Sequence, residues 1–295
     1  MENVTRCAVC GSENSSDFIE CTDHFVSGEN FIISSCDECG FCFTNPRPEL
    51  SDSASYYESE KYISHSKTNK GLTNILFHQA RKFTIRYKRN IAKKYSSAPS
   101  ILDYGCGTGD FLHAMKHAGF NCTGLEPNAT AREHAVSNYG LSVIRENELG
   151  AIADSSLGCI SLWHVLEHVY PLEERLQQFY SKLQPGGTLI VAVPNMSSFD
   201  ARKYKSHWAA YDVPRHIYHF TPETLLRLME RIGFAHIKTK PMRLDAFYIS
   251  LLSEKYRHGH EKFISAFFTG LRSNFSACFG KGNYSSLIYI FKKSK

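Results

Sequence analysis

The stretch Ser100-Ile-Leu-Asp-Tyr-Gly-Cys-Gly-Thr-Gly-Asp-Phe-Leu112 decides how the rest of this 295-residue chain is interpreted. Residues 100–104 are apolar and predict a short strand, and residues 110–116 predict the first turns of a helix. The alternate glycines between them are Gly105, Gly107 and Gly109. Because only glycine lets the backbone turn sharply while approaching a flat ligand, this turn predicts a binding site at the end of a strand.

Two acidic residues accompany the glycine turn. Asp103 lies at the end of the first strand, and Glu126 follows a second predicted strand at 121–125. A carboxylate at this point suits a ribose diol, which offers two hydroxyl donors to one pair of acceptor oxygens. The turn lacks the wider glycine spacing that suits a pyrophosphate at a helix N-terminus, so a nucleoside without phosphates is the predicted ligand.

This constellation resembles the class I S-adenosylmethionine (SAM) dependent methyltransferases, whose first motif has the form hydrophobic–Asp-x-Gly-Cys-Gly-Thr-Gly, as at 102–109. Segments 162–169 and 183–195 resemble their fourth strand, next helix and fifth strand, so the resemblance covers about residues 99 to 240. It implies an α/β fold with a doubly wound, Rossmann-like seven-stranded sheet, and SAM as cofactor. The cofactor-binding residues that it implies are Asp103, Gly105, Cys106, Gly107, Gly109, Glu126, Pro127, Asn128, Trp163 and His164.

Strands and helices alternate through the rest of the chain, as a doubly wound sheet requires. The expected helices are 128–139, 171–183 and 222–232, and the expected strands are 141–145, 158–163, 187–193, 236–240 and 286–291. The resemblance implies that the last strand inserts antiparallel beside the fifth. Residues 245–284 form an apolar insertion before it, for which a packed helical cover is favoured over a membrane anchor. Residues 99–295 are therefore expected to form one methyltransferase domain.

Four of the ten cysteines form two Cys-x-x-Cys-Gly pairs, Cys7 with Cys10 and Cys36 with Cys39. Two intervening residues place both thiolates of a pair on one tight turn, and two such turns give a tetrahedral site for structural zinc. A disulfide pair or a degenerate site is the alternative, and four thiolates leave no open position for catalysis. The 25 residues between the pairs can hold a hairpin, so residues 1–48 are expected to form a small zinc-ribbon lobe.

Residues 49–98 are predicted to contain a linker and a basic amphipathic helix. From Lys61 to Ala98 there are ten Lys/Arg residues and no acidic residue. The apolar residues that recur there at helical spacing are Leu72, Leu76, Ala80, Phe83, Tyr87 and Ile91, which predicts a helix over 71–95. A helix that packs on the catalytic domain is favoured over an anion-binding face for nucleic acid, a membrane or a phosphorylated substrate.

A catalytic base is expected at the carboxyl ends of the strands, and two segments offer one. The first segment, 164–168, resembles the Leu-Glu-His of ubiquinone-pathway O-methyltransferases, some of which use nearby carboxylates with a divalent ion. His164 stands in place of their upstream acid, which argues against a metal here. His168 is the candidate base in this segment, and structural support of the SAM pocket is the equal alternative for both Glu167 and His168.

The second segment is the loop 208–221, in which two histidines, an arginine, an aspartate and several aromatic residues are crowded together. Loops of this composition on a rigid sheet usually bind a ligand. Its Pro-Arg-His-x-x-His-Phe-Thr stretch is similar to one in many bacterial methyltransferases of small molecules and sugars. His216 is the first candidate for the base and His219 the second, and at least one of the two is expected to be structural.

The acceptor is expected to be a small molecule, a sugar or a lipid-linked compound that is methylated on oxygen. The segment after the fourth strand reads Trp-His-Val-Leu, without the Asn/Asp-Pro-Pro-aromatic clamp of amino-methylating nucleic-acid enzymes or a nucleophilic cysteine near proline. Methylation of carbon is left open. The alternatives are a zinc-ribbon RNA (rRNA) methyltransferase, which would use the basic helix to bind nucleic acid, and a non-catalytic zinc- and SAM-binding adaptor.

Composition is consistent with an enzyme of one main domain and an appendage. No apolar run reaches the ~18–20 residues that span a bilayer, and the N-terminus lacks a signal-peptide core, so only peripheral membrane contact is considered. The cysteines outside the two pairs are scattered, which favours a reducing cytoplasm. The net charge of +5 comes largely from the basic helix and the C-terminal third.

Overall fold

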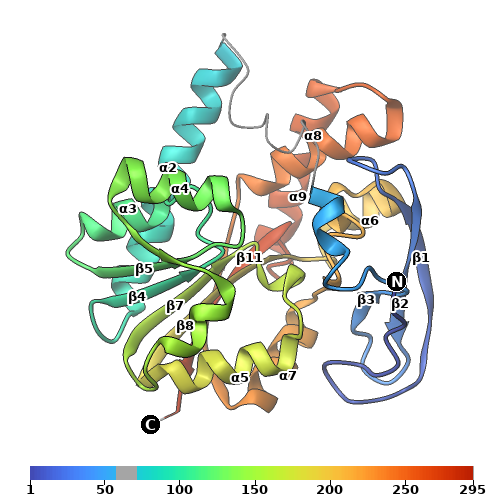
Figure 1. The fold of residues 1–295 in the computed structure, drawn as a ribbon. Helices are drawn as coiled ribbons and strands as arrows, with labels where there is room; N and C mark the ends of the chain where they lie inside the picture. The colour runs from blue at the N-terminus through green and yellow to red at the C-terminus, as the bar shows by residue number, and fades with distance from the viewer. Residues whose placement is uncertain (58–71, 295) are drawn as a thin grey trace.

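The computed structural model of the chain describes residues 1–57 and 72–294 (Figure 1). The part of the predicted basic stretch at 61–71 lies outside the described residues, and side chains are described from residue 79 onward in the helix that follows.

A seven-stranded sheet forms the centre of the molecule, with the strand order β10-β11-β8-β7-β4-β5-β6. Its strands are β4 (Ser100–Tyr104), β5 (Asn121–Leu125), β6 (Ser142–Ile144), β7 (Leu157–Trp163), β8 (Leu183–Pro194), β10 (Phe234–Pro241) and β11 (Ser286–Lys293). β4 to β8 run parallel, whereas β11 runs antiparallel to both β8 and β10. The predicted α/β fold and the antiparallel insertion of the last strand are thus confirmed.

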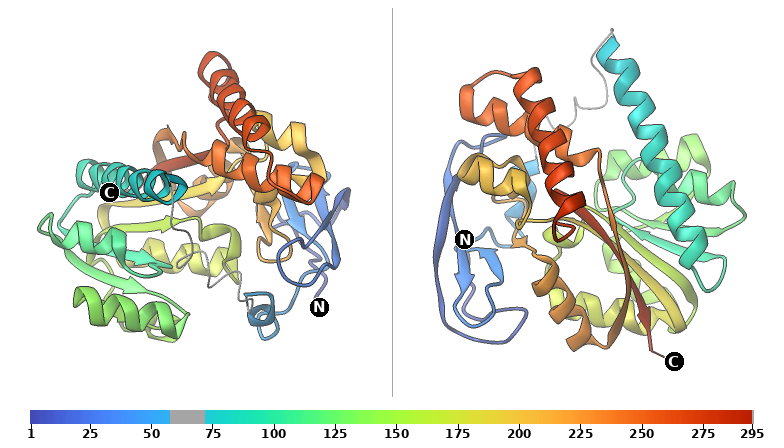
Figure 2. Two further views of the ribbon diagram at one scale, coloured as in Figure 1. Left: turned by 90° about the horizontal axis from the view of Figure 1, so that it is seen from above. Right: turned by 180° about the vertical axis from the view of Figure 1, so that it is seen from behind.

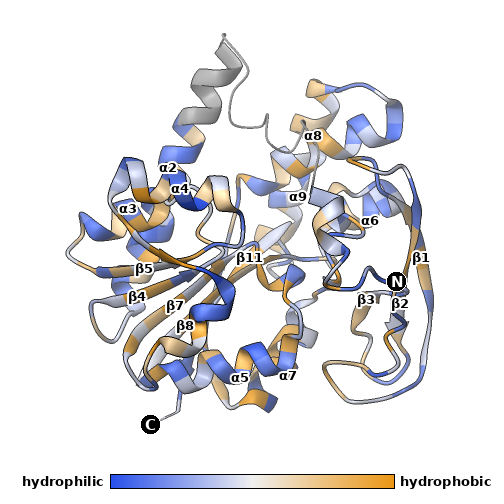
Figure 3. Ribbon diagram, viewed as in Figure 1, coloured by the Kyte–Doolittle hydropathy of each residue, from blue (hydrophilic) through white to orange (hydrophobic). Residues whose placement is uncertain are grey.

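Apolar residues alternate across the sheet and bury both of its faces. Ile101, Cys159, Ile190 and Ile288 face one helical layer, and their neighbours Leu102, Ile160, Val191 and Tyr289 face the other. The first layer contains α2 (Leu72–Tyr95), α3 (Asp110–Lys116) and α4 (Ala129–Tyr139), and the second contains α5 (Leu172–Lys182) and α7 (Pro222–Ile232). Figure 3 shows the hydrophobic residues along the central strands. The sheet therefore holds a rigid edge for a site at its carboxyl ends.

Two details of this core differ from the sequence-based expectation. β8 begins at Leu183 rather than at 187, since the strand continues through a turn at Gly186, whose φ of 73° lies in the left-handed region. Phe83, which the helical spacing of α2 predicted to be on the packed side, is 63% exposed. The buried residues on the inward side of α2 are Ile91 and Ala92, about two helical turns further on.

The N-terminal lobe has a sheet of its own, which takes its last strand from a loop far along the chain. β1 (Ser15–Thr22) and β2 (Asn30–Cys36) form the predicted hairpin, and β3 (Cys42–Thr44) extends it. The fourth strand is β9 (Tyr218–His219), which lies in the histidine-rich loop and pairs antiparallel with β3. A short helix, η1 (Ser53–Tyr57), follows the lobe. The lobe and the loop are therefore joined through backbone hydrogen bonds.

Short helices and a helical hairpin complete the fold. The short helices are η2 (Glu146–Ala151), η3 (Leu166–His168), α6 (Phe199–Tyr204), η4 (Lys205–His207) and η5 (Ala209–Tyr211). The insertion predicted at 245–284 forms a hairpin of α8 (Asp245–His258) and α9 (Phe263–Phe279). No helix in the described part of the chain has both the length and the apolar character needed to cross a membrane.

Candidate active site and cysteine site

The glycine turn between β4 and α3 has the backbone that its sequence predicts. The φ angles of Gly105, Gly107 and Gly109 are 75°, 55° and 85°, all in the left-handed region. A Cβ at Gly105 would lie 2.6 Å from Val165 Cγ2, so this glycine is required by packing. A Cβ at Gly107 would meet nothing within 4 Å. Gly107 thus borders open space, as a cofactor-binding turn should.

Glu126 is held at this turn by two backbone amides. Its Oε2 accepts a hydrogen bond from Gly107 N at 2.8 Å, and its Oε1 accepts one from Asn128 N at 2.9 Å. Pro127 and Asn128 follow it, and the Asn128 side chain caps α4 by accepting from Ala131 N. Each carboxylate oxygen keeps a further acceptor site, so the arrangement fits the two hydroxyls of a ribose.

Asp103, Trp163 and Lys88 lie together beside this turn. Asp103 accepts a hydrogen bond from Ser161 Oγ at 2.6 Å, and burial raises its pKa to about 7. Lys88 Nζ lies 4.8 Å from the centre of the Trp163 ring, and burial lowers the pKa of this lysine. Trp163 Nε1 is a buried donor without an acceptor among the described residues. An acceptor for Trp163 Nε1 is the feature that a ligand would add here.

Cys106 and Trp163 both pack tightly against neighbouring residues beside the glycine turn. Cys106 is buried against Gly124, where a Cβ would lie 2.6 Å from its Sγ. The Trp163 ring packs edge-on against Phe111 in α3, with ring centres 5.3 Å apart. These two residues therefore form part of the wall of the predicted cofactor site.

His164 joins the sheet edge to the helical hairpin. Its φ of 59° is unusual for a residue other than glycine, and such strain clusters at functional sites. Its Nε2 lies 3.0 Å from Asp245 Oδ2, at the start of α8, and its Nδ1 lies 3.6 Å from Glu167 Oε1. Burial alone would lower the pKa of His164, but the two carboxylates outweigh it and raise the pKa to about 9. His164 is therefore an imidazolium at neutral pH.

Glu167 is the buried centre of a cluster of histidines. It is 1% exposed, and neither of its carboxylate oxygens has a hydrogen-bond partner within 1–57 and 72–294. Burial would raise the pKa of Glu167, but the contact with His164 and the other histidines beside it outweigh burial and lower it. A buried, ionised carboxylate without hydrogen bonds is costly, which marks this position as one that serves a ligand or a proton.

His216 approaches Glu167 from the histidine-rich loop. Its Nε2 lies 3.9 Å from Glu167 Oε1 and 3.9 Å from Asp212 Oδ2. Its Nδ1 lies 2.8 Å from the carbonyl oxygen of Ala210. Because a carbonyl only accepts, Nδ1 carries the hydrogen and the lone pair is at Nε2. The fold thus presents a basic nitrogen with two carboxylates beside it.

His168 and His219 are placed differently. His168 Nδ1 lies 2.9 Å from the Arg215 carbonyl oxygen and 2.9 Å from the Tyr57 hydroxyl, and burial next to His216 lowers its pKa to about 4. His219 is buried in β9, where its Nε2 lies 3.1 Å from Thr44 Oγ1, and burial lowers its pKa to about 3. Both are neutral at physiological pH, and His219 lies within the sheet of the N-terminal lobe.

An ion pair ties the histidine loop to the N-terminal lobe. Arg215 Nη2 lies 2.8 Å from Asp23 Oδ1 and 2.7 Å from Asp212 Oδ1, and both Arg215 and Asp23 are buried. Burial would raise the pKa of Asp23, but the hydrogen bond from Arg215 outweighs it and lowers the pKa to about 2. Ile217 N also donates to the Glu167 carbonyl oxygen at 2.9 Å. The two segments in which a catalytic base was expected, 164–168 and 208–221, therefore lie in one cluster.

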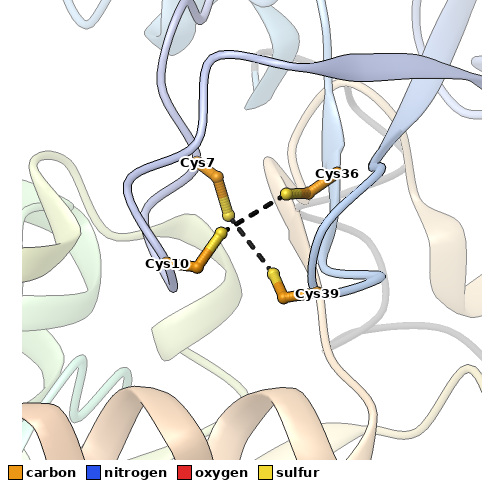
Figure 4. A group of neighbouring side chains, drawn as sticks. All are labelled: Cys7, Cys10, Cys36 and Cys39. Carbon is orange, nitrogen blue, oxygen red and sulfur yellow. Dashed lines mark hydrogen bonds between the residues drawn. The ribbon is translucent and has the colours of Figure 1, made fainter.

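The four paired cysteines meet at the tip of the lobe (Figure 4). Cys7 Sγ lies 3.6 Å from Cys39 Sγ, and Cys10 Sγ lies 3.5 Å from Cys36 Sγ. All four sulfur atoms lie within 4.8 Å of one another. Since a tetrahedral zinc ion with Zn–S bonds of about 2.3 Å separates its sulfurs by about 3.8 Å, the group has the size of a zinc site.

A second group could hold a metal ion, formed by Glu167, His168 and His216. One ligand atom of each lies within 4.8 Å of the others. One carboxylate and two imidazoles are ligands that suit a transition metal, but His168 and His216 already bond through Nδ1 to backbone carbonyls. Each would therefore ligate through Nε2, the same atom that a proton acceptor would use.

Sequence analysis missed four residues of this region, which are Asp23, Tyr57, Lys88 and Asp245. Lys88 lies three residues before the buried Ile91, on the inward side of α2. The spacing of Lys88 and Ile91 could therefore have predicted from sequence that Lys88 faces the sheet. No local sequence pattern marks Asp23 or Asp245 as part of the site, because their partners Arg215 and His164 are 192 and 81 residues away along the chain.

A Rossmann-like sheet of this strand order, with a glycine turn after its first strand and a carboxylate after its second, defines the fold of the class I methyltransferases. The chain belongs to the methyltransferase domain family, whose model matches residues 76–239. This confirms the predicted resemblance to SAM-dependent methyltransferases over more than half of the chain.

Curated relatives match parts of the chain. A probable S-adenosylmethionine-dependent methyltransferase of Mycolicibacterium smegmatis is 25% identical over 165 residues, which are 54% of this chain and 60% of that protein. A ubiquinone biosynthesis O-methyltransferase of Actinobacillus pleuropneumoniae is 33% identical over 107 residues, 32% of this chain and 45% of that protein. The chain therefore spans about half the length of the curated relatives it matches.

Among solved structures, a SAM-dependent methyltransferase from Archaeoglobus fulgidus has a TM-score of 0.52 and 21% identity. The match covers 76% of this chain and all of that one. A putative methyltransferase of Haloferax volcanii, in complex with the Trm112 methyltransferase activator, also has a TM-score of 0.52, at 12% identity. It covers 74% of this chain and 95% of that one. At these identities, the likeness supports the fold.

Proposed function

We propose that this protein transfers the methyl group of SAM to a hydroxyl oxygen of a small-molecule, sugar or lipid-linked acceptor, with His216 as the general base. The observation that carries this proposal is the position of His216 Nε2, whose lone pair lies beside the carboxylates of Glu167 and Asp212. Bound SAM supplies the methyl group as an electrophile, so the protein's tasks are to position the acceptor and to remove its proton.

The cluster is suited to that proton transfer. When His216 Nε2 takes the proton of an acceptor hydroxyl, the imidazole becomes an imidazolium next to two negative charges, which stabilise it. The Ala210 carbonyl keeps the ring in the correct tautomer throughout. The oxygen forms its bond to the methyl group as its bond to hydrogen breaks. His168 and His219, which are neutral and bonded elsewhere, are proposed to position the loop rather than to act as bases.

The surroundings of His216 favour a small acceptor. A cavity beside His216 is lined by Trp208, Tyr218 and Phe220, together with Pro194, Met196, Ala210 and His219. This lining is mostly aromatic and apolar with few polar groups, as in sites for small ligands. The ubiquinone biosynthesis O-methyltransferases among the relatives support oxygen as the methylated atom.

For the cofactor, we propose that Glu126 holds the ribose hydroxyls and that Asp103 receives the ammonium group of the methionine part. Gly105, Gly107 and Gly109 shape the turn, and Trp163 and His164 border the site. We further propose that Cys7, Cys10, Cys36 and Cys39 hold a structural zinc ion that fixes the lobe in residues 1–48, next to the methyltransferase domain in 99–295.

The proposal is tested with methyl-labelled SAM and an extract from cells that lack the gene. We expect label in the small polar or lipid fraction, and we expect His216→Ala to reduce the rate at least ~100-fold while the affinity for S-adenosylhomocysteine stays within about twofold. His236→Ala, on the exposed strand β10, is the matched control and should retain full activity. Label in the RNA fraction, or normal turnover by His216→Ala, would contradict the proposal.

A further inference from the structure

The helix α9 in the insertion presents its large apolar residues to solvent. The side chains concerned are Phe263, Ile264, Phe267, Phe268, Leu271, Phe275 and Phe279. Ile264 is 77% exposed, Phe268 62% and Phe279 76%. Figure 2 shows α9 on the outer side of α6 and α8 in both views. Contiguous exposed apolar faces of this kind mark interaction sites. We call this set the α9 face.

The opposite side of α9 explains why the large residues point outward. The buried positions hold small side chains, which are Ala266, Thr269, Gly270, Ser273 and Ala277. A Cβ at Gly270 would lie 2.7 Å from Phe247, so α8 and α9 approach one another closely. Small residues fill the packed side, and of the seven large ones Phe267 also contacts Phe247 in α8, with ring centres 5.6 Å apart, while all seven stay largely exposed. The α9 face is therefore unexplained by the stability of the hairpin.

The segment that carries the α9 face is basic, which favours an anionic partner. Between residues 255 and 281, five basic residues (Lys255, Arg257, Lys262, Arg272 and Lys281) stand against one acidic residue, Glu261. α9 itself contains no acidic residue. A second copy of the chain would bring two positive rims together, which costs free energy. A surface with anionic groups outside and an apolar interior would interact favourably with both the basic residues and the α9 face.

We propose that the α9 face docks on an anionic lipid bilayer, with its phenylalanines in the headgroup boundary and the surrounding Lys and Arg on the lipid phosphates. A helix with aromatic and aliphatic residues on one side and basic residues at its borders has the composition of an interfacial helix. Docking would also place the active site near the bilayer, since Asp245 at the start of α8 contacts His164. The docking itself is independent of the proposed methyl acceptor.

Vesicle flotation with the full chain tests this proposal. The vesicles contain either equal amounts of phosphatidylglycerol and phosphatidylcholine, or phosphatidylcholine alone. We expect the wild type to float with the anionic vesicles only. The double variant Ile264→Ser, Phe268→Ser should bind at least tenfold more weakly, because it removes two of the apolar side chains that would be buried in the bilayer. Phe18→Ser, which removes another half-exposed phenylalanine from β1, is the matched control and should bind like the wild type.

Further measurements test whether vesicle binding depends on charge and whether the variants are folded. The double variant Lys262→Glu, Lys281→Glu should lose its preference for anionic vesicles, and binding should weaken with added salt. S-adenosylhomocysteine affinity and circular dichroism should be unchanged in every variant, which separates docking from folding and from the cofactor site. Absence of wild-type binding to anionic vesicles, or a wild-type dimer by light scattering that Ile264→Ser, Phe268→Ser converts to a monomer, would overturn the proposal.

Discussion

The cofactor edge and the histidine cluster both lie at the carboxyl ends of the strands, yet they are built in different ways. The cofactor edge comes mainly from one stretch of chain, residues 103–128, with Lys88 and Trp163 beside it, and the contacts of Glu126 are local and made to backbone. The histidine cluster draws Asp23 from the N-terminal lobe, Tyr57 from η1 and Asp245 from the hairpin, in addition to 164–168 and 212–216. Cofactor binding thus belongs to the core sheet, whereas the proposed acceptor chemistry depends on the appended parts.

The largest effect is expected from damage to the cofactor edge alone. Glu126→Gln should weaken binding of S-adenosylhomocysteine about 100-fold, since charge-assisted hydrogen bonds to the ribose contribute roughly 3 kcal/mol together. Titration calorimetry measures the affinity, and Glu148→Gln, an exposed residue in η2, is the control. If Glu126→Gln kept the wild-type affinity, the ribose would be bound elsewhere.

A smaller effect is expected from damage to the histidine cluster alone. Asp23→Asn removes the buried partner of Arg215 and should lower turnover about tenfold, with little change in cofactor affinity. It should also lower the free energy of unfolding by roughly 3 kcal/mol, because it leaves a buried charge partly unpaired. Since the pKa of folded Asp23 is lowered to about 2, its contribution is present above about pH 4 and is lost as the pH falls through 2. An equal loss of cofactor affinity would contradict the separation of the cofactor edge from the histidine cluster.

The smallest effect concerns His164, at the boundary of the two regions. Its folded pKa is raised to about 9, so its stabilising contribution is complete below pH 6.5 and is lost as the pH rises through 9. We expect the wild type to lose about 2 kcal/mol of unfolding free energy between pH 6.5 and 9, allowing for the partial exposure of the ring. Denaturant unfolding at several pH values measures this. His164→Gln should have a flatter profile, and parallel profiles would refute the assignment.

The same contrast explains what sequence could predict. The glycine turn, Glu126 and the cysteine pairs follow from short-range patterns, and the structure has each of them. The antiparallel last strand was implied only by the family resemblance, and the structure has it too. The meeting of Glu167 with His216 could not be read from the chain, because it depends on β9 joining the sheet of the N-terminal lobe. The neutral state of His219 follows from its burial against Thr44, which only the fold reveals.

The same dependence on the lobe gives the account its most direct test. The proposed zinc is removed with a chelator, and both S-adenosylhomocysteine affinity and methyl transfer to the acceptor are then measured on the same sample. We predict that cofactor affinity stays within about threefold while transfer falls at least ~100-fold and returns when zinc is restored. Cys278→Ser, which changes an exposed cysteine outside the cluster, should behave like the wild type. Unchanged transfer after complete metal removal would contradict the central claim that the N-terminal lobe builds the acceptor half of the site.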